Sequence, residues 1–267
     1  MTCPYLYQEK YEKEGTGLEK ISKSEIYTPL QFGAREHELL EEHYLKECIN
    51  WRYPPSGIDP LEVEAVEMIN LYKAHYPAEE FEVVDVEHVF RLPIPNSHHF
   101  AIGKIDLTVR SHITEHLDII DHKTQNRSSK SNQPQKWAAR AQASLYLWAE
   151  RQLRPNEQID NFYVNILVRQ SPAGEKPPYF PDRQKLERTQ EQIDKALLDL
   201  ATIADTIELY RQKFGDKPWP SSTEQCYTWG ECEFYLPHTY GWSDEIRKTK
   251  FKPREEYLQI KGIGEIG

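Results

Sequence analysis

Hydrophobic and polar residues alternate along three consecutive segments of the chain, residues 81–94, 98–110 and 115–124. A period of two places successive side chains on opposite faces of a strand, so each segment predicts a β-strand. Only residues 111–114 separate the second segment from the third, and so short a connection favours an antiparallel hairpin. We therefore expect a meander of three strands in the middle of the chain.

Apolar residues at helical spacing stand on both sides of this meander. The predicted helices are 29–50 (beginning after Gly33), 61–75, 136–152 and 182–214, the last ended by Gly215. A further strand is expected at 160–170, loops are expected at 51–60 and 125–135, and the chain beyond 214 is expected to be irregular. This order predicts an α/β fold with a mixed central β-sheet flanked by helices. The helix 136–152 provides the crossover that a parallel strand pair needs.

Composition limits the classes of protein that fit. The chain has 267 residues, a formal net charge of −10, and no apolar run near the roughly 20 residues that span a bilayer. No basic region followed by an apolar one stands at the N-terminus, so we expect a cytoplasmic protein, in the host cytoplasm if a phage encodes it. The negative charge argues against binding nucleic acid by bulk charge alone. Residues 122–142, however, contain five Lys or Arg residues and no Asp or Glu, which allows a local basic groove.

Charged residues end the third strand of the meander, where a buried strand would not need them. Asp121 and Lys123 are two residues apart and so share a face, and Asp106 lies on the preceding strand. In a hairpin, Asp106 falls within one or two residue pairs of Asp121, where two carboxylates repel unless a cation lies between them. Oxygen ligands of this kind suit Mg²⁺ or Mn²⁺, and such an ion activates water against a phosphodiester. A solvated strand end is the alternative interpretation.

Four short motifs, in this order, resemble those of the PD-(D/E)XK nuclease superfamily, and of its RecB-like branch in particular. They are "FGAREHELLEEHYL" as Gly-x-x-x-His, "GKID", "IIDHKT" as Asp-x-Lys, and "QASLY" as Gln-x-x-x-Tyr. The branch includes phage-type exonucleases and the CRISPR-adaptation nucleases, and the resemblance covers about residues 3–170 and 226–238. It implies a restriction-endonuclease-like core and a nuclease activity that uses Mg²⁺ or Mn²⁺.

The resemblance also implies a set of metal ligands. His37, Asp106 and Asp121 would bind the ion, helped by the backbone carbonyl of His122. Asp121 stands where many relatives have Glu, and either carboxylate can bind a metal. The imidazole of His37 would favour Mn²⁺ over Mg²⁺. Glu87, in the middle of the first strand, is expected to be solvated rather than to support these ligands.

Further roles follow for residues around the metal. Lys123 would be the catalytic lysine, and Gln142 and Tyr146, four apart on one helix face, would contact nucleic acid or hold the active-site water. Beside this centre we expect DNA phosphate contacts from the basic run, with a solvated loop and helix face as the alternative. The residues expected to bind DNA are Arg127, Lys130, Lys136 and Arg140.

The cysteines allow a second metal centre. Some members of the same branch bind an iron–sulfur cluster through one early and three late cysteines. Cys3 in "TCPYLYQEKY" matches the early position, and Cys226 and Cys232 in "CYTWGECEFYLPH" match two late ones, whereas His238 stands where the last cysteine would be. Three thiolates and one imidazole could hold zinc or an unusual iron–sulfur cluster. A site that holds no metal and packs as core is the alternative.

Together these features predict a metal-dependent DNA nuclease, and the branch favours an exonuclease acting on DNA ends or single strands in recombination, repair or phage DNA processing. We expect one domain over residues 1–267, with a helical part at about 1–80, a catalytic core at about 81–170 and a cysteine-containing C-terminal part at about 171–267. No Gly-x-x-x-x-Gly-Lys-Ser/Thr motif is present, so unwinding would need a helicase or recombination partner. Ring-forming relatives make an oligomer compatible with this prediction.

Three alternatives stay open at this stage. The first is a catalytically weak module that binds nucleic acid or a recombination protein. The second is a nuclease restricted to RNA or to structured junctions. The third is a sheet-based metal-binding protein of unrelated function, which would cleave no phosphodiester with any metal.

Overall fold

The computed structural model describes residues 3–12, 17–21, 29–45, 60–127, 134–170, 176–227 and 231–253. The chain divides into two compact units. One comprises residues 26–95 and 100–197, and the other comprises 1–25, 96–99 and 198–267. The strands of the meander, and with them the candidate active site, belong to the first unit. The expectation of one domain over the whole chain stays a prediction.

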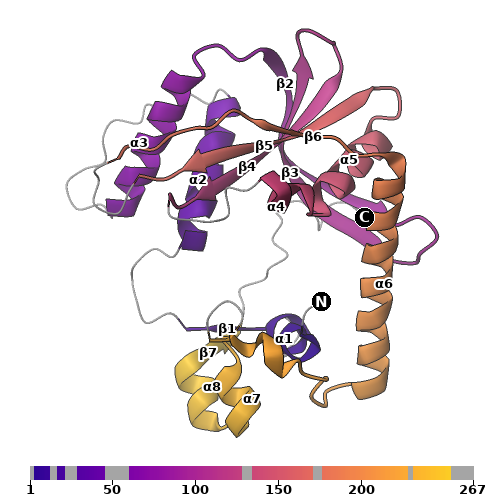
Figure 1. Ribbon diagram of the computed structural model, residues 1–267. Coiled ribbons are helices and arrows are strands. Elements are labelled where there is room, and N and C mark those ends of the chain that lie inside the picture. Colours follow the sequence, from indigo (N-terminus) through magenta and orange to yellow (C-terminus); the bar gives the residue numbers. More distant parts are fainter. Residues whose placement is uncertain are drawn as a thin grey trace. The chain divides into compact units, whose positions relative to one another are not determined.

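A five-stranded mixed sheet forms the centre of the first unit (Figure 1). Its strands, in their order across the sheet, are β2 (Phe81–Pro93), β3 (Phe100–Ser111), β4 (Leu117–Gln125), β5 (Ile159–Val168) and β6 (Gln184–Leu186). Neighbouring strands are antiparallel except β4 and β5, which are parallel. The predicted meander, the parallel return strand and the mixed α/β sheet are therefore confirmed.

Helices cover both faces of this sheet, and Figure 1 shows α2 and α3 together, away from α4 and α5. Helices α2 (Pro29–Tyr44) and α3 (Pro60–His75) bury one apolar stripe each. Their buried residues pack in one cluster with Leu107 and Ile120 of the sheet. On the other face, Tyr146 of α5 (Gln142–Leu153) contacts the rings of Phe90 and Phe162. Helix α2 begins before Gly33, not after it, and the loop predicted at 51–60 falls almost entirely outside the described residues.

The helix predicted at 136–152 is two helices. Helix α4 (Pro134–Ala138) ends before a corner at residues 139–141, and α5 begins at Gln142. The guanidinium of Arg188 holds this corner, because its Nη2 donates to the carbonyl oxygens of Ala138 at 2.7 Å and Arg140 at 3.4 Å. These carbonyls have a side-chain partner in place of the backbone donors of a continued helix. Much of the loop predicted at 125–135 lies outside the described residues.

The helix predicted at 182–214 begins later, as α6 (Gln190–Phe214), because residues 184–186 form β6. Thr189 caps it: Thr189 Oγ1 accepts from the backbone N–H of Gln192, and Gln192 Oε1 accepts from the backbone N–H of Thr189. This reciprocal pair is a capping box, which starts a helix at the next residue. Gly215, with φ +53°, ends the helix as predicted.

The second unit contains short elements where the C-terminal part was expected to be irregular. They are α1 (Pro4–Tyr7), η1 (Gln8–Glu12), β1 (Leu18–Lys20), η3 (Thr223–Tyr227), α7 (Tyr235–Tyr240), α8 (Asp244–Lys250) and β7 (Phe251–Pro253). Strand β1 pairs with β7, and the buried side chains of Tyr5, Leu18, Phe234 and Phe251 form a small core. The prediction failed here because this core joins the two ends of the chain. Among the described helices, none combines the length and the apolar character needed to cross a membrane.

Candidate active site

Strand register brings three carboxylates to adjacent positions on neighbouring strands. Val86 pairs with Leu107 and His88 with Ile105, which places Glu87 of β2 opposite Asp106 of β3. The last pair of the β3–β4 ladder is Leu107 with Ile120, so the next position on each strand sets Asp106 opposite Asp121. The proximity of Asp106 and Asp121 that the hairpin predicted is therefore present, with Glu87 as a third acid.

His37 of α2 faces this row of acids. Its Nδ1 lies 3.5 Å from Oε1 of Glu87 and 3.6 Å from Oδ2 of Asp106. One ligand atom from each of these three residues lies within 4.8 Å of the others. The backbone N–H of His122 donates to Asp106 Oδ2 at 2.7 Å and fixes that carboxylate. The arrangement offers one imidazole nitrogen and several carboxylate oxygens at a common point.

Asp121 is held from two sides. Lys123 Nζ lies 2.6 Å from Oδ2, and Gln142 Nε2 donates to Oδ1 at 2.9 Å. The Asp121 side chain is only 1% exposed, so both partners act in a poorly solvated environment where charge interactions are strong. Tyr146 is hydrogen-bonded to Gln142 and near Asp106 and Asp121, and burial raises the pKa of its phenol. The sequence prediction thus named residues that meet in space, although their roles stay predictions.

The imidazole of His122 points away from this set. It stacks on Tyr44 with ring centroids 5.7 Å apart, and its Nδ1 lies 2.8 Å from Asn165 Nδ2. Burial holds the pKa of this imidazole well below its usual range. This is consistent with His122 helping a metal through its backbone rather than its ring, which stays a prediction.

Electrostatics show that the site favours a cation. Burial, followed by the charge of Asp121, raises the pKa of Asp106 to about 7, and burial also raises the pKa of Asp121. Ionising both of these buried, neighbouring carboxylates costs free energy unless a positive charge lies beside them. Carboxylate oxygens with one imidazole are a donor set that Mg²⁺ or Mn²⁺ accepts, with the imidazole favouring Mn²⁺. The ligand atoms of His37, Glu87 and Asp106, which lie within 4.8 Å of one another, fit a divalent ion, with Asp121 opposite Asp106 on the next strand.

Glu87 is the residue that the sequence reasoning did not assign to the site. It was expected to be solvated, but its side chain is 6% exposed and contacts Lys104 as well as His37. Its backbone is left-handed, with φ +50° in the middle of a strand, which is strained for a residue with a side chain. The alternation of side chains between the two faces of β2 reverses at Glu87. Val86 packs with the α2–α3 cluster, whereas His88 and Phe90 contact α5 on the other face.

Neutralising Glu87 tests its part in metal binding. We expect Glu87→Gln to raise the Mn²⁺ concentration needed for half-maximal cleavage by roughly 10–100-fold, because one anionic oxygen is lost from the set. Glu82→Gln, on the same strand but exposed, is the matched control. Metal titrations that coincide for Glu87→Gln and Glu82→Gln would remove Glu87 from the site.

The predicted DNA-contacting residues differ in their placement. Arg140 is exposed at the corner before α5, stacks on Trp137 at 4.4 Å, and its charge lowers the pKa of Asp121. Arg127 lies over the ring of Tyr179 and donates to the carbonyl of Pro177. Lys136 is exposed on α4, and Lys130 lies outside the described residues. Among the described residues predicted to contact DNA, Arg140 is the one whose charge acts on Asp121.

The predicted cysteine site lies in the second unit. Cys3 accepts from the backbone N–H of Ser222 at 3.5 Å, Cys232 N donates to the carbonyl of Cys226 at 2.8 Å, and burial raises the pKa of the Cys232 thiol. His238 packs on Tyr5, with ring centroids 4.9 Å apart. Among the described residues, these four side chains are not one of the groups whose ligand atoms all lie within 4.8 Å. A zinc or iron–sulfur site here stays a prediction.

Comparison with known proteins identifies the family. The model of the PD-(D/E)XK nuclease superfamily matches residues 1–234, and the chain belongs to this superfamily. Its nucleases generally use divalent metals such as Mg²⁺. No curated protein matches the chain.

Two solved structures show more distant likenesses. A protein from Eubacterium rectale with a provisional exonuclease name has a TM-score of 0.47 and 16% identity, over 85% of this chain and 79% of that one. A protein named SSO0001 has a TM-score of 0.31 and 15% identity, over 74% of this chain and 84% of that one.

Proposed function

We propose that this nuclease-superfamily chain is a divalent-metal-dependent deoxyribonuclease, and that it acts as an exonuclease on DNA ends or single strands. The observation that supports cleavage most directly is the Lys123 ammonium 2.6 Å from Asp121, on the strand position next to Asp106. A lysine is thereby held at a buried carboxylate pair that favours a cation. DNA as substrate and exonuclease action rest on the four motifs shared with the RecB-like branch.

Each residue has a part in this proposal. His37, Glu87, Asp106 and Asp121 would hold Mg²⁺ or Mn²⁺, which supplies a water of lowered pKa and stabilises charge on the phosphate. Gln142 orients Asp121 through its 2.9 Å hydrogen bond. Lys123 places a positive charge where the attacked phosphate oxygens would gain negative charge. Arg140, exposed beside Asp121, binds a neighbouring phosphate of the DNA strand.

The fold determines the positions of Asp121, Lys123 and Gln142 relative to each other. Asp121 and Lys123 occur on the same strand face because they are two residues apart. Gln142 reaches them because α5 begins at that residue, after the corner at 139–141. A substrate phosphate would therefore meet the acids from the sheet and the amide from the start of α5 together.

The test is a cleavage assay on end-labelled linear single-stranded and double-stranded DNA, with Mg²⁺, Mn²⁺ or EDTA, beside closed circular DNA and RNA. We expect cleavage of linear DNA with either metal, none in EDTA, and mononucleotide or short products that grow from the ends. Cleavage of closed circles would overturn the exonuclease part and leave the nuclease part. Binding of DNA without cleavage in either metal would replace the proposal with a binding module.

A further inference from the structure

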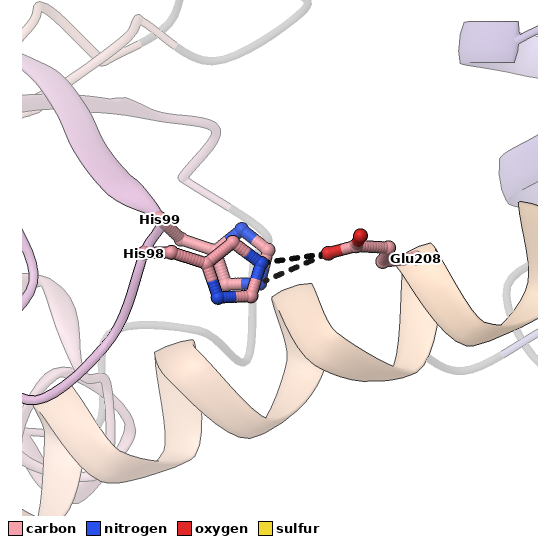
Figure 2. Close-up of side chains that lie close together, drawn as sticks. All are labelled: His98, His99 and Glu208. Carbon is pink, nitrogen blue, oxygen red and sulfur yellow. Dashed lines mark hydrogen bonds and ion pairs between the residues drawn. The ribbon is translucent and has the colours of Figure 1, made fainter.

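A second group of metal-type side chains lies outside the active site, in the second unit. His98 and His99, in the β2–β3 connection, meet Glu208 of α6 (Figure 2), and His99 also lies beside Asp205 of α6. His98 Nε2 lies 2.8 Å and His99 Nε2 3.8 Å from the same oxygen, Oε2 of Glu208. His99 Nε2 also lies 2.9 Å from Asp205 Oδ1. The Nε2 atoms of His98 and His99 and a carboxylate oxygen of Glu208 therefore lie within 4.8 Å of one another, and Asp205 contacts His99 beside this group.

Local structure brings the two rings to the same side. Neighbouring residues of a strand point to opposite faces, but residues 97–99 are not in a strand. Asn96 takes a left-handed conformation with φ +57°, and the backbone N–H of His99 donates to Ser97 Oγ at 3.2 Å. The imidazoles of His98 and His99 consequently lie side by side, with ring centroids 4.0 Å apart.

Contacts within α6 also orient the carboxylates that face the two imidazoles. Asp205 and Glu208 are three residues apart on α6, so they are neighbours on one face. Gln212 Nε2 donates to Glu208 Oε1 at 3.2 Å, which leaves Oε2 directed at the imidazoles, as Figure 2 shows. A hydrogen bond that orients a carboxylate through its other oxygen is the usual outer support of a metal ligand.

Ion pairing alone accounts poorly for this geometry. Oε2 of Glu208 faces both rings, whereas a carboxylate oxygen needs one imidazolium partner, and two imidazolium rings 4.0 Å apart would repel each other. One divalent ion in place of both protons would satisfy both rings and the carboxylate of Glu208. Donors about 2.1 Å from an ion at tetrahedral positions are roughly 3.4 Å from each other. The separations of 2.8 and 3.8 Å between Glu208 Oε2 and the two Nε2 atoms bracket that value.

We infer that His98, His99 and Glu208 bind a zinc ion, separate from the proposed catalytic metal. Two imidazoles select Zn²⁺ over Mg²⁺, and three protein ligands leave the fourth tetrahedral position to a water molecule. The ion joins segments that are far apart in the sequence, so its binding stabilises the folded chain. This inference does not depend on the proposed nuclease activity.

The test is titration of the metal-free full chain with Zn²⁺ by calorimetry and with Co²⁺ by visible absorption. All proteins carry Asp106→Asn, so that metal binding at the active site is weakened. We expect one Zn²⁺ to bind and to raise the unfolding temperature. His98→Gln, at an exposed side chain, or Glu208→Gln, at a partly buried one, should weaken this binding at least about 10-fold. The Co²⁺ spectrum should be tetrahedral and show no thiolate charge-transfer band.

His112→Gln is the matched control, because His112 is exposed in the β3–β4 connection and belongs to no such group among the described residues. It should bind Zn²⁺ like its parent. Equal Zn²⁺ affinity and stoichiometry in the His98, Glu208 and His112 variants would overturn the inference, as would Co²⁺ bound through thiolates alone. Without Asp106→Asn, His98→Gln should keep full Mg²⁺-dependent cleavage, so failure of the zinc site and failure of the nuclease proposal are distinguishable.

Discussion

Asp121→Asn will remove metal-dependent DNA cleavage, with a loss of at least roughly 10³-fold in rate, because the ion loses an anionic ligand at the reacting phosphate. The amide is nearly isosteric, so the fold should survive. Asp121 is 1% exposed and is bonded to Lys123 and Gln142, so the change also releases Lys123 from its partner. The measurement is the initial rate on end-labelled linear DNA at several Mn²⁺ concentrations.

Asp118→Asn is the control for this experiment. Asp118 is a buried aspartate on the same strand, but its carboxylate accepts from the backbone N–H and side-chain amide of Asn161, away from the acidic row. It should keep nearly full activity. Lys123→Ala should also lose cleavage yet still bind Mn²⁺. Cleavage that persists in both Asp121→Asn and Lys123→Ala would locate the chemistry elsewhere in the chain.

Asp106→Asn will change how stability depends on pH in the metal-free protein. The folded-state pKa of Asp106 is raised from 3.8 to about 7, first by burial and then by Asp121. For a raised pKa, the stabilising contribution is complete below the unfolded value and is lost as pH rises through the folded value. The wild type should therefore lose stability between about pH 4 and pH 7, on the order of 4 kcal/mol from this group.

Thermal unfolding of wild type and Asp106→Asn at pH 5 and pH 8, with EDTA or Mn²⁺, measures this. The variant should be the more stable of the two at pH 8 in EDTA. Mn²⁺ should stabilise the wild type more at pH 8 than at pH 5, because the carboxylates must release protons to bind it, and it should stabilise the variant little. If the unfolding temperatures of the two proteins in EDTA change equally with pH, the raised pKa of Asp106 is contradicted.

Much of the site could be predicted from local pattern. Alternation in three segments places Asp121 and Lys123 on one face, and a hairpin sets Asp106 opposite them. The same register argument, applied to 81–94 and 98–110, would have set Glu87 opposite Asp106. The left-handed backbone at Glu87 could not be predicted, because it reverses the alternation on which the method depends.

Other features depend on contacts between distant residues. The break at 139–141 interrupts a segment of good helix formers, and it is held by Arg188, far along the chain. The meeting of His98 and His99 with Glu208 needs a turn and a helix that no local pattern relates. The start of α6, in contrast, was readable from Thr189 and Gln192, whose spacing is that of a capping box.

Arg188 has a mechanical consequence for the molecule. It directly precedes the Thr189 cap of α6, and its guanidinium donates to Ser144 Oγ at 3.1 Å as well as to the carbonyls of Ala138 and Arg140. The corner that positions Gln142 and the first turn of α6 are therefore joined through one side chain. A displacement of the corner would strain these bonds and be transmitted as a force to the first turn of α6, so the corner and this turn move as one piece.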